Sequence, residues 1–245
     1  MNSLRFLQID VGNSAAKWRL LEGREIIARG NYSLSEETSR VELLGCTAAL
    51  DHIWISSVAS PAAESELADL LSEQWRVEPW FARTPAQTGS LLNSYEDPSR
   101  MGVDRWLAML AAWQRQQGPV CVVDAGSALT IDMVIDTGQH QGGYIIPGAA
   151  LMERALLLDT ERVRFEQEVD YDLFPGTSTA EAVRHGIALA QVGAVSVALD
   201  ACAESMALYF CGGGGEKLRA LLQRGGEYIP DLVFEGLEIL AAENM

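Results

Sequence analysis

A hydrophobic strand that ends in an aspartate and runs into a glycine turn occurs twice in this chain, and this repeat limits the possible folds more than any other feature. Phe6–Ile9 leads into Asp10 in the first copy, and Val122–Val123 leads into Asp124 in the second, 114 residues later. In both copies hydrophobic residues then alternate with polar ones, which predicts a returning antiparallel strand. The repeat therefore predicts a duplicated α/β fold in which a hairpin opens each half.

The tips of these hairpins carry groups suited to phosphate oxygens. In the first hairpin Gly12 permits close backbone approach, and the Ser14 hydroxyl and Lys17 ammonium are donors. Asp10 could hold a magnesium ion or its waters, and Ser127 supplies the hydroxyl of the second hairpin. One such hairpin is most often an ordinary turn with a polar tip, so the prediction of a phosphate site depends on the repeat.

The charge of the chain excludes some partners. Of its 245 residues 48% are hydrophobic, and the formal net charge is −16. The chain can therefore bury a large core, but it lacks the cationic excess that nucleic acids and anionic membranes require. The same negative field repels ATP, so a phosphate site must gather positive charge locally, from Lys17, from an arginine such as Arg105 and from bound cations.

The cysteines and the N-terminus indicate the compartment. The 4 cysteines and 3 histidines have no metal-ligand spacing, so no zinc site is expected. Reduced cysteines are typical of cytoplasmic proteins, and the first residues lack the basic and apolar regions of a signal peptide. No uncharged apolar run approaches the length of a membrane span. We therefore expect a cytoplasmic protein with no membrane partner.

Periodicity and turn residues predict the other elements. In the first half we expect strands over 25–30, 53–58 and 76–81, a helix from Pro61 to Gln74, a polar loop over 84–99 and a helix over 103–116. Gln117-Gly118-Pro119 ends that helix, so we expect domains over 1–117 and 118–245. In the second half we expect a strand over 142–148, a helix over 149–158, a long helix from Thr179, a strand before the glycines 212–215 and a closing helix.

A short motif at the start of the helix over 103–116 is a second candidate site. Gly102-Val103-Asp104-Arg105 follows Tyr95 and places Asp104 and Arg105 in the first helical turn. Spacing alone favours a simpler explanation of this motif: Asp104 complements the helix dipole, and Arg105 beside it is solvated.

The long helix of the second half begins with a capping box. Ser178 and Glu181 have the required spacing. With Ser178 as the cap, Thr179 becomes the first helical residue, where its hydroxyl and the free N–H groups could meet a polar ligand. Most capping boxes are purely structural.

Together the motifs resemble a known family. Two strand-Asp-x-Gly hairpins, each with a serine at its tip, resemble the phosphate motifs of the acetate kinase, sugar kinase, Hsp70 and actin superfamily. Gly-x-Asp-Arg after a tyrosine, and Gly-Gly-x-Ile-x-Pro-Gly over 142–148, are similar to type III pantothenate kinases. The resemblance implies an α/β fold of two tandem ribonuclease H-like domains with an interdomain ATP cleft. It also implies that ATP and magnesium convert pantothenate to 4′-phosphopantothenate, the first step of coenzyme A biosynthesis.

The resemblance further implies roles for single residues. The ATP phosphates would be bound by Asp10, Val11, Gly12, Asn13, Ser14, Ala15, Ala16, Lys17 and Ser127. Pantothenate would be bound by Tyr95, Gly102, Val103, Asp104, Arg105 and Thr179, with Asp104 as the catalytic base for the substrate hydroxyl. Asp124 would bind a monovalent cation, potassium or ammonium. The active site would lie near a homodimer interface, where the small residues Ala190, Gly193 and Ala194 would permit close helix packing.

Two alternatives remain open at this point. Another kinase or phosphatase of the superfamily would keep both hairpins but has no reason to carry Tyr95 with the segment 102–105. A non-catalytic regulatory relative would keep the fold without needing Lys17 or Asp104. Ser14 and Ser127 stand where the family more often has threonine, which leaves the contact of Ser127 open.

Overall fold

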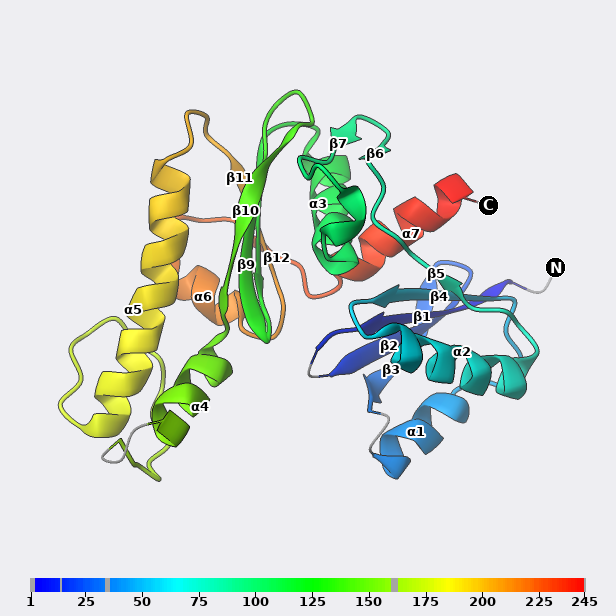
Figure 1. Ribbon diagram of the computed structural model, residues 1–245, viewed down its shortest axis with the longest axis horizontal. Coiled ribbons are helices and arrows are strands. Elements are labelled where there is room, and N and C mark those ends of the chain that lie inside the picture. The colour runs from blue at the N-terminus through cyan, green and yellow to red at the C-terminus, as the bar shows by residue number, and fades with distance from the viewer. Residues whose placement is uncertain (1–2, 14, 34–35, 160–162, 245) are drawn as a thin grey trace. The chain divides into compact units, whose positions relative to one another are not determined.

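The computed structural model describes residues 3–13, 15–33, 36–159 and 163–244 of the chain (Figure 1). The chain divides into two compact units. The first unit comprises residues 1–88, 95–111 and 233–245, and the second comprises residues 89–94 and 112–232. Each unit is built around its own five-stranded sheet.

The sheet of the first unit joins an antiparallel meander to two parallel strands. Its strands are β1 (Arg5–Val11), β2 (Ala16–Glu22), β3 (Glu25–Tyr32), β4 (His52–Ser57) and β5 (Trp80–Phe81), in the spatial order β3-β2-β1-β4-β5. Helices α1 (Glu37–Leu44) and α2 (Pro61–Trp75) cover one face, where Leu7 and Ile9 of β1 pack with Leu43 and Leu71 in a buried core. Because side chains alternate along β1, the other face carries Gln8.

That second face binds the C-terminal helix α7 (Leu232–Asn244). Arg19 of β2 is buried, its Nη2 donates to Glu238 Oε1 at 2.6 Å, and its guanidinium lies over the Phe234 ring. Gln8 donates to the same carboxylate oxygen at 3.2 Å. The last helix therefore belongs to the unit formed by the start of the chain.

The second unit repeats the first. Its strands are β8 (Val120–Ala125), β9 (Ala128–Val134), β10 (His140–Pro147), β11 (Ala207–Cys211) and β12 (Glu227–Tyr228), in the order β10-β9-β8-β11-β12. The first three are again antiparallel, and β11 runs parallel to β8. Helices α5 (Thr179–Asp200) and α6 (Gly215–Leu222) contribute to the core of one face, and α4 (Ala149–Asp159) packs on α5. The predicted duplication of an α/β fold is confirmed.

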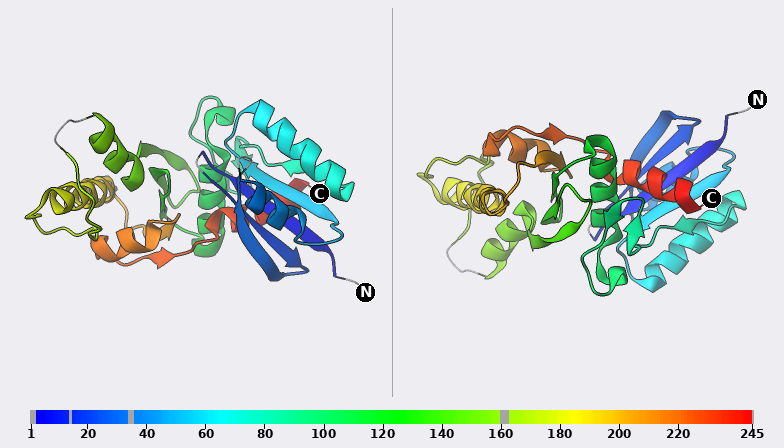
Figure 2. Two further views of the ribbon diagram at one scale, coloured as in Figure 1. Left: turned by 90° about the horizontal axis from the view of Figure 1, so that it is seen from below. Right: turned by 90° about the horizontal axis from the view of Figure 1, so that it is seen from above.

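Helix α5 has an unusual composition. Among the described residues it alone is long and apolar enough to cross a membrane by length and composition, and 28% of its most apolar window is buried. Val195 and Ala198 place one side of α5 in the core over β9, while Leu189 and Val197 are 60% and 70% exposed. Figure 2 shows this helix along the outside of its sheet in both views.

Most of the predicted elements are present, and the differences lie in short elements. Helix α3 (Val103–Gln116) has the predicted bounds. The strand expected over 76–81 is confined to β5, because Arg76 takes a left-handed conformation and caps α2. The polar loop expected over 84–99 contains β6 (Gln87–Thr88), β7 (Leu91–Leu92) and the start of the 3₁₀ helix η1 (Pro98–Arg100). Neither α1 nor β12 was expected.

The observed units and the expected domains over 1–117 and 118–245 differ in three places. Helix α7 packs with the first unit, through the contacts of Arg19 described above, and residues 89–94 group with the second. Residues up to Ala111 of α3 group with the first unit, and the remainder of that helix groups with the second.

Candidate functional site

The first hairpin places Asp10 among polar partners. In the pairing of the sheet Asp10 lies opposite Lys17 of β2 and opposite Ser56 of β4, so the three side chains share one face. The Ser56 hydroxyl, which is fully buried, donates to Asp10 Oδ1 at 2.8 Å. This bond fixes the carboxylate at the end of β1. Ser56 was missed in the sequence, although a strand ending in Ser-Ser beside Asp10 is a usable signal.

The tip of this hairpin is a tight backbone turn. The Gly12 amide donates to the Ala15 carbonyl at 3.1 Å, and Asn13, Ala15 and Lys17 are exposed. Val11 and Ala16 face each other at the ends of β1 and β2. Ser14 lies outside the described residues. The described residues of the tip therefore present backbone groups and the Lys17 ammonium.

The second hairpin has the same plan with a shorter turn. The Gly126 amide donates to the Ala128 carbonyl at 2.9 Å, and Ser127 at the tip is exposed. Asp124 lies opposite Thr130 of β9 and Cys211 of β11. The residue opposite the aspartate is thus Lys17 in the first hairpin and Thr130 in the second.

Glycines of two predicted motifs pack against the main chain of this second hairpin. Gly212 has a φ of +76°, and a Cβ on it would collide with Asp124 Oδ1 and with Ala125. The Gly148 amide donates to the Ser127 carbonyl at 3.0 Å, and a Cβ there would collide with the Gly126 carbonyl. Both positions require glycine because the main chain of the hairpin approaches too closely for a side chain.

The first unit also holds the motif at the start of α3. Arg105 is 6% exposed, its Nη1 donates to the Tyr95 hydroxyl at 2.9 Å, and its guanidinium lies 5.8 Å from the centre of the Tyr95 ring. The simpler explanation of the motif, in which Arg105 is solvated, is therefore excluded. Thr84 donates to the Met101 carbonyl at 2.9 Å and fixes the chain just before the motif.

Asp104 is held in place by its neighbours. Its Oδ1 accepts the Arg105 amide at 2.8 Å, and a Cβ built on Gly102 would lie only 2.5 Å from the same oxygen. Val58, which follows β4, approaches that Cβ position to 3.7 Å. The structure thus brings Tyr95, Gly102, Val103, Asp104 and Arg105 together, and glycine at 102 leaves room for the carboxylate.

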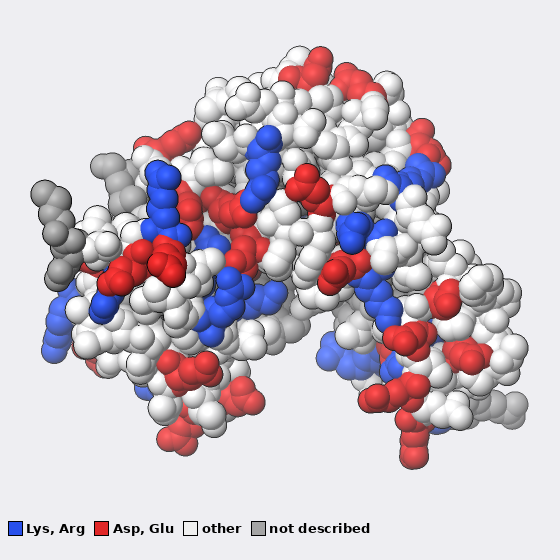
Figure 3. Space-filling model, turned by 180° about the vertical axis from the view of Figure 1, so that it is seen from behind, with Lys and Arg blue, Asp and Glu red and all other residues white. Residues whose placement is uncertain are grey.

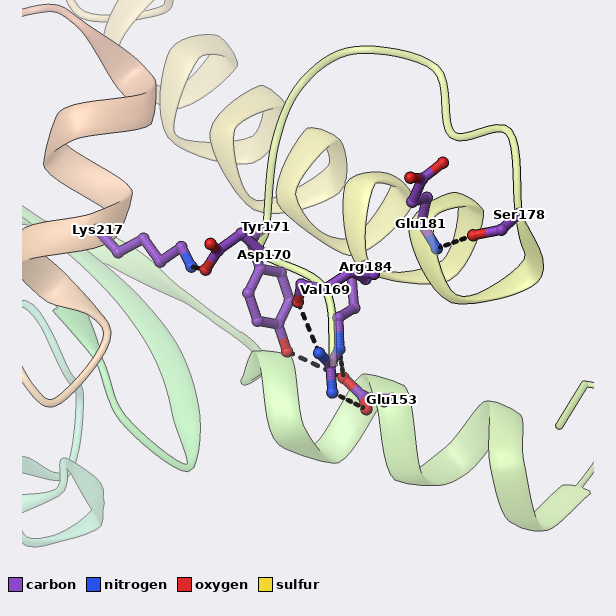
Figure 4. Close-up of polar contacts among 8 residues, drawn as sticks. All are labelled: Glu153, Val169, Asp170, Tyr171, Ser178, Glu181, Arg184 and Lys217. Atoms are coloured by element: carbon purple, nitrogen blue, oxygen red, sulfur yellow. Dashed lines mark hydrogen bonds and ion pairs between the residues drawn. The ribbon is translucent and has the colours of Figure 1, made fainter. Parts of the chain in front are cut away.

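Thr179 lies in the second unit, at the first position of α5. Ser178 caps the helix, its Oγ accepting the Glu181 amide at 3.2 Å (Figure 4). Glu181 Oε2 also accepts from the amide and hydroxyl of Thr177 at 2.7 and 2.9 Å. These two bonds lower the pKa of Glu181. Thr179 itself is exposed.

A charged cluster, formed by Glu153, Arg184, Tyr171 and the Val169 carbonyl, ties the chain before α5 to helices α4 and α5 (Figure 4). Arg184 donates to both Glu153 oxygens at 3.1 Å and to the Val169 carbonyl at 2.6 Å. Tyr171 donates to Glu153 Oε2 at 3.1 Å. Hydrogen bonding by Arg184 is the main cause that lowers the pKa of Glu153. Nothing in the spacing of these residues predicted the cluster.

Helices α4 and α5 also form an apolar groove of about 730 Å³. Its walls include Leu151 and Leu156 of α4 and Thr179, Gly186 and Ala190 of α5. Leu151 and Leu156 are 41% and 39% exposed, and nothing lies within 4 Å of a Cβ built on Gly186. An apolar surface of this kind typically marks an interaction site.

Metal-ligating side chains are dispersed over the described residues. No group of three or more His, Cys, Asp or Glu side chains is close enough to hold a metal ion in the described part of the chain. On the face shown in Figure 3, Lys and Arg side chains are interspersed with Asp and Glu.

Comparison with known proteins identifies relatives of the whole chain. The family model described as type III pantothenate kinase matches residues 6–201. A protein of Marinobacter nauticus named type III pantothenate kinase is 39% identical over 247 aligned positions, covering 98% of this chain and 99% of that protein.

Solved structures share the fold. A protein of Campylobacter jejuni described as a Baf family transcriptional activator superposes with a TM-score of 0.63 at 24% identity, covering 97% of this chain and 98% of that one. A protein of Sinorhizobium meliloti described as a 2-dehydro-3-deoxygalactonokinase gives a TM-score of 0.62 at 14% identity, with 98% and 99% covered. At these identities the likeness shows the fold alone, which is that of the sugar kinase, Hsp70 and actin class.

Proposed function

Because the chain belongs to the type III pantothenate kinase family, we propose that it transfers a phosphoryl group from ATP, bound with magnesium, to the hydroxyl of pantothenate. The product is 4′-phosphopantothenate, in the first step of coenzyme A biosynthesis. The observation that carries the proposal is the cluster of Tyr95, Gly102, Asp104 and Arg105 in one unit, with Asp104 held by the Arg105 amide. Such a cluster gives a phosphoryl acceptor both a binding surface and a base.

Asp104 is the base in this proposal. Phosphoryl transfer passes through a loose transition state, so the enzyme mainly aligns the reactants and neutralises charge. A carboxylate within hydrogen-bond reach of the acceptor hydroxyl can take its proton late in the reaction. The bond from the Arg105 amide orients the Asp104 carboxylate, and Gly102 leaves it the space it occupies.

Arg105, Tyr95 and Val103 bind pantothenate beside the base. Arg105 is almost fully buried and donates to Tyr95, so it orders the tyrosine and offers its planar guanidinium to a polar or carboxylate group of the substrate. Arg105→Lys should mainly raise the pantothenate KM, because lysine cannot supply the paired N–H groups. Thr179, at the N-terminal end of α5, is the contact to pantothenate across the dimer interface.

We assign each hairpin a role in binding ATP phosphates. The tip residues 11–16 with Lys17, and Ser127 at the second tip, supply backbone and side-chain donors. Asp10, held by Ser56, holds the magnesium ion or its waters. Charge neutralisation by Lys17 and magnesium offsets the negative field of the chain.

Asp124 binds a monovalent cation, potassium or ammonium. The Asp124 carboxylate supports this assignment, because hard cations prefer oxygen ligands and the main chain of Ala125 lies close to this side chain. The cation supplies positive charge next to the second hairpin. In the wild-type protein potassium should raise both the melting temperature and turnover, and Asp124→Asn should remove both effects.

The chain acts as a homodimer in the cytoplasm. The apolar groove of α4 and α5, together with the exposed Leu189 and Val197, is the surface we assign to a second copy. Thr179 lines this groove, so the interface adjoins a pantothenate contact. The four cysteines are free thiols, as expected in a reducing compartment.

Coupled ADP release with ATP, magnesium, potassium and pantothenate tests the proposal. Asp104→Asn should lower kcat by about 10²- to 10⁴-fold, the range for a lost general base. Asp69→Asn, which changes an exposed carboxylate on α2, serves as the matched control and should leave kcat unchanged. No turnover of pantothenate by the wild-type protein would contradict the proposed function.

A further inference from the structure

A buried histidine links β10 to the segment just before Tyr95. His140 has no exposed surface, and its Nδ1 lies 2.9 Å from the Ser94 hydroxyl. On the other side of the ring, Nε2 lies 3.2 Å from Asp132 Oδ1. All three residues belong to the second unit, and none has a part in the proposed phosphoryl transfer.

The chemistry of the three groups sets the direction of these hydrogen bonds. An ionised carboxylate can only accept, so Nε2 of His140 carries the proton and donates to Asp132, which is 1% exposed. In a neutral imidazole Nδ1 is then an acceptor, and the Ser94 hydroxyl donates to it. Asp132 thus orients the imidazole ring so that its Nδ1 faces the Ser94 hydroxyl.

The residues before Ser94 are bonded to the turn that precedes His140. The Leu92 amide donates to the Gly138 carbonyl at 2.9 Å, and Leu92 pairs with Gln139 as an isolated bridge. Gly138 has a φ of +82°, and a Cβ on it would collide with the Ser90 carbonyl. Ser90 in turn accepts from Trp113 Nε1 at 2.9 Å. Ser94 is the last contact of this series before the chain reaches Tyr95.

We propose that His140, held by Asp132, is a positioning residue for pantothenate binding, because it fixes Ser94 and thereby the main chain from which Tyr95 reaches Arg105. Tyr95 then has a restraint on each side, since its own hydroxyl accepts from Arg105 and its preceding residue is bonded to His140. The inference rests on the proposed function of Tyr95.

The structure offers a selective test, because Ser94 is exposed and its hydroxyl can be removed without opening the core. Ser94→Ala should raise the pantothenate KM roughly three- to tenfold, the effect of one hydrogen bond. The ATP KM and kcat should stay at the wild-type values, and the melting temperature should fall only slightly, because the buried Nδ1 of His140 loses one partner. Ser94→Thr, which keeps the hydroxyl, should restore the KM.

Two further variants separate positioning from a general structural role. His140→Gln should raise the pantothenate KM as Ser94→Ala does, and the double variant should add little, because both remove one interaction. Ser90→Ala is the matched control, since it deletes a hydroxyl contact of equal length in the same segment but further from Tyr95. It should leave the pantothenate KM unchanged.

The position of Tyr95 can be measured without activity. In protein labelled with fluorotyrosine, the Tyr95 resonance, assigned with Tyr95→Phe, should shift or broaden in Ser94→Ala and stay unchanged in Ser90→Ala. An unchanged resonance and an unchanged pantothenate KM in Ser94→Ala would overturn the inference. Equal changes in Ser94→Ala and Ser90→Ala would also overturn it. Absence of turnover in the wild-type protein would instead contradict the proposed function.

Discussion

Gly102→Ala should lower kcat with little loss of stability. A Cβ at this position would lie 2.5 Å from Asp104 Oδ1, whereas ordinary van der Waals contact begins at 3.4 Å. The carboxylate must therefore move by roughly 1 Å, and the next atom to be met, Val58 Cγ1 at 3.7 Å, is already at an acceptable distance. Because the obstacle is the end of a side chain and no positive φ is involved, the backbone can stay in place.

The expected kinetic effect follows from that displacement. A misplacement of about 1 Å in a catalytic group can cost about 10²-fold in rate, so kcat should fall about 10- to 100-fold while the ATP KM is unchanged. Coupled ADP release gives the rate, and thermal melting gives the stability. Gly118→Ala is the control, because its Cβ would meet only Gln116 atoms at 3.9 Å or more. A wild-type kcat in Gly102→Ala would refute the role of Asp104 as a precisely placed base.

Three other predictions concern the charged cluster, the interface and the first hairpin. Glu153→Gln should lower the free energy of unfolding at pH 7 by about 1–3 kcal/mol, the range for a charge-assisted hydrogen bond. Because Arg184 lowers the pKa of Glu153 in the folded protein, this stabilisation is present above the pKa of the unfolded state and is lost as pH falls through the pKa of the folded state. The free energies of unfolding of the two proteins, measured with denaturant, should therefore converge in acid. Leu189→Glu should shift the protein from dimer to monomer in analytical ultracentrifugation, and an unchanged mass would contradict the assigned interface. Ser56→Ala removes the hydroxyl that donates to Asp10 and should weaken magnesium-dependent turnover several-fold without changing the pantothenate KM, as measured by a magnesium titration.

The sequence predicted well those features that depend on local patterns. The two hairpins, α3 and the long helix from Thr179 follow from hydrophobic periodicity and from turn and cap residues, which act over a few positions. Helix α1 escaped prediction because its apolar pattern is weak, with Ser39 and Leu43 as its buried residues. Strand β12 has two residues, too few for a period to be recognised.

The parts that the sequence did not predict depend on contacts between distant residues. Helix α7 joins the first unit because Glu238 bonds to the buried Arg19, 219 positions earlier. The bond from Ser56 to Asp10 likewise needs the parallel pairing of β1 and β4. Arg105 was expected near the substrate, but its burial and its bond to Tyr95 appear only when the fold is known. These pairs of residues are therefore determined by how distant strands and helices pack in the fold, and not by residue type alone.

The duplicated sheets give two equivalent carboxylates different neighbours. At the same position in the parallel pairing, Asp10 faces Ser56 and Asp124 faces Cys211. A hydroxyl is a good donor to a carboxylate and a thiol is a weak one, so Asp10 is oriented by a side chain at 2.8 Å. At Asp124 the main chain is close as well, since a Cβ on Gly212 would collide both with Asp124 Oδ1 and with the main chain of Ala125. In the proposed function, the carboxylate oriented by a hydroxyl is the one assigned to magnesium, and the carboxylate beside Cys211 is the one assigned to the monovalent cation.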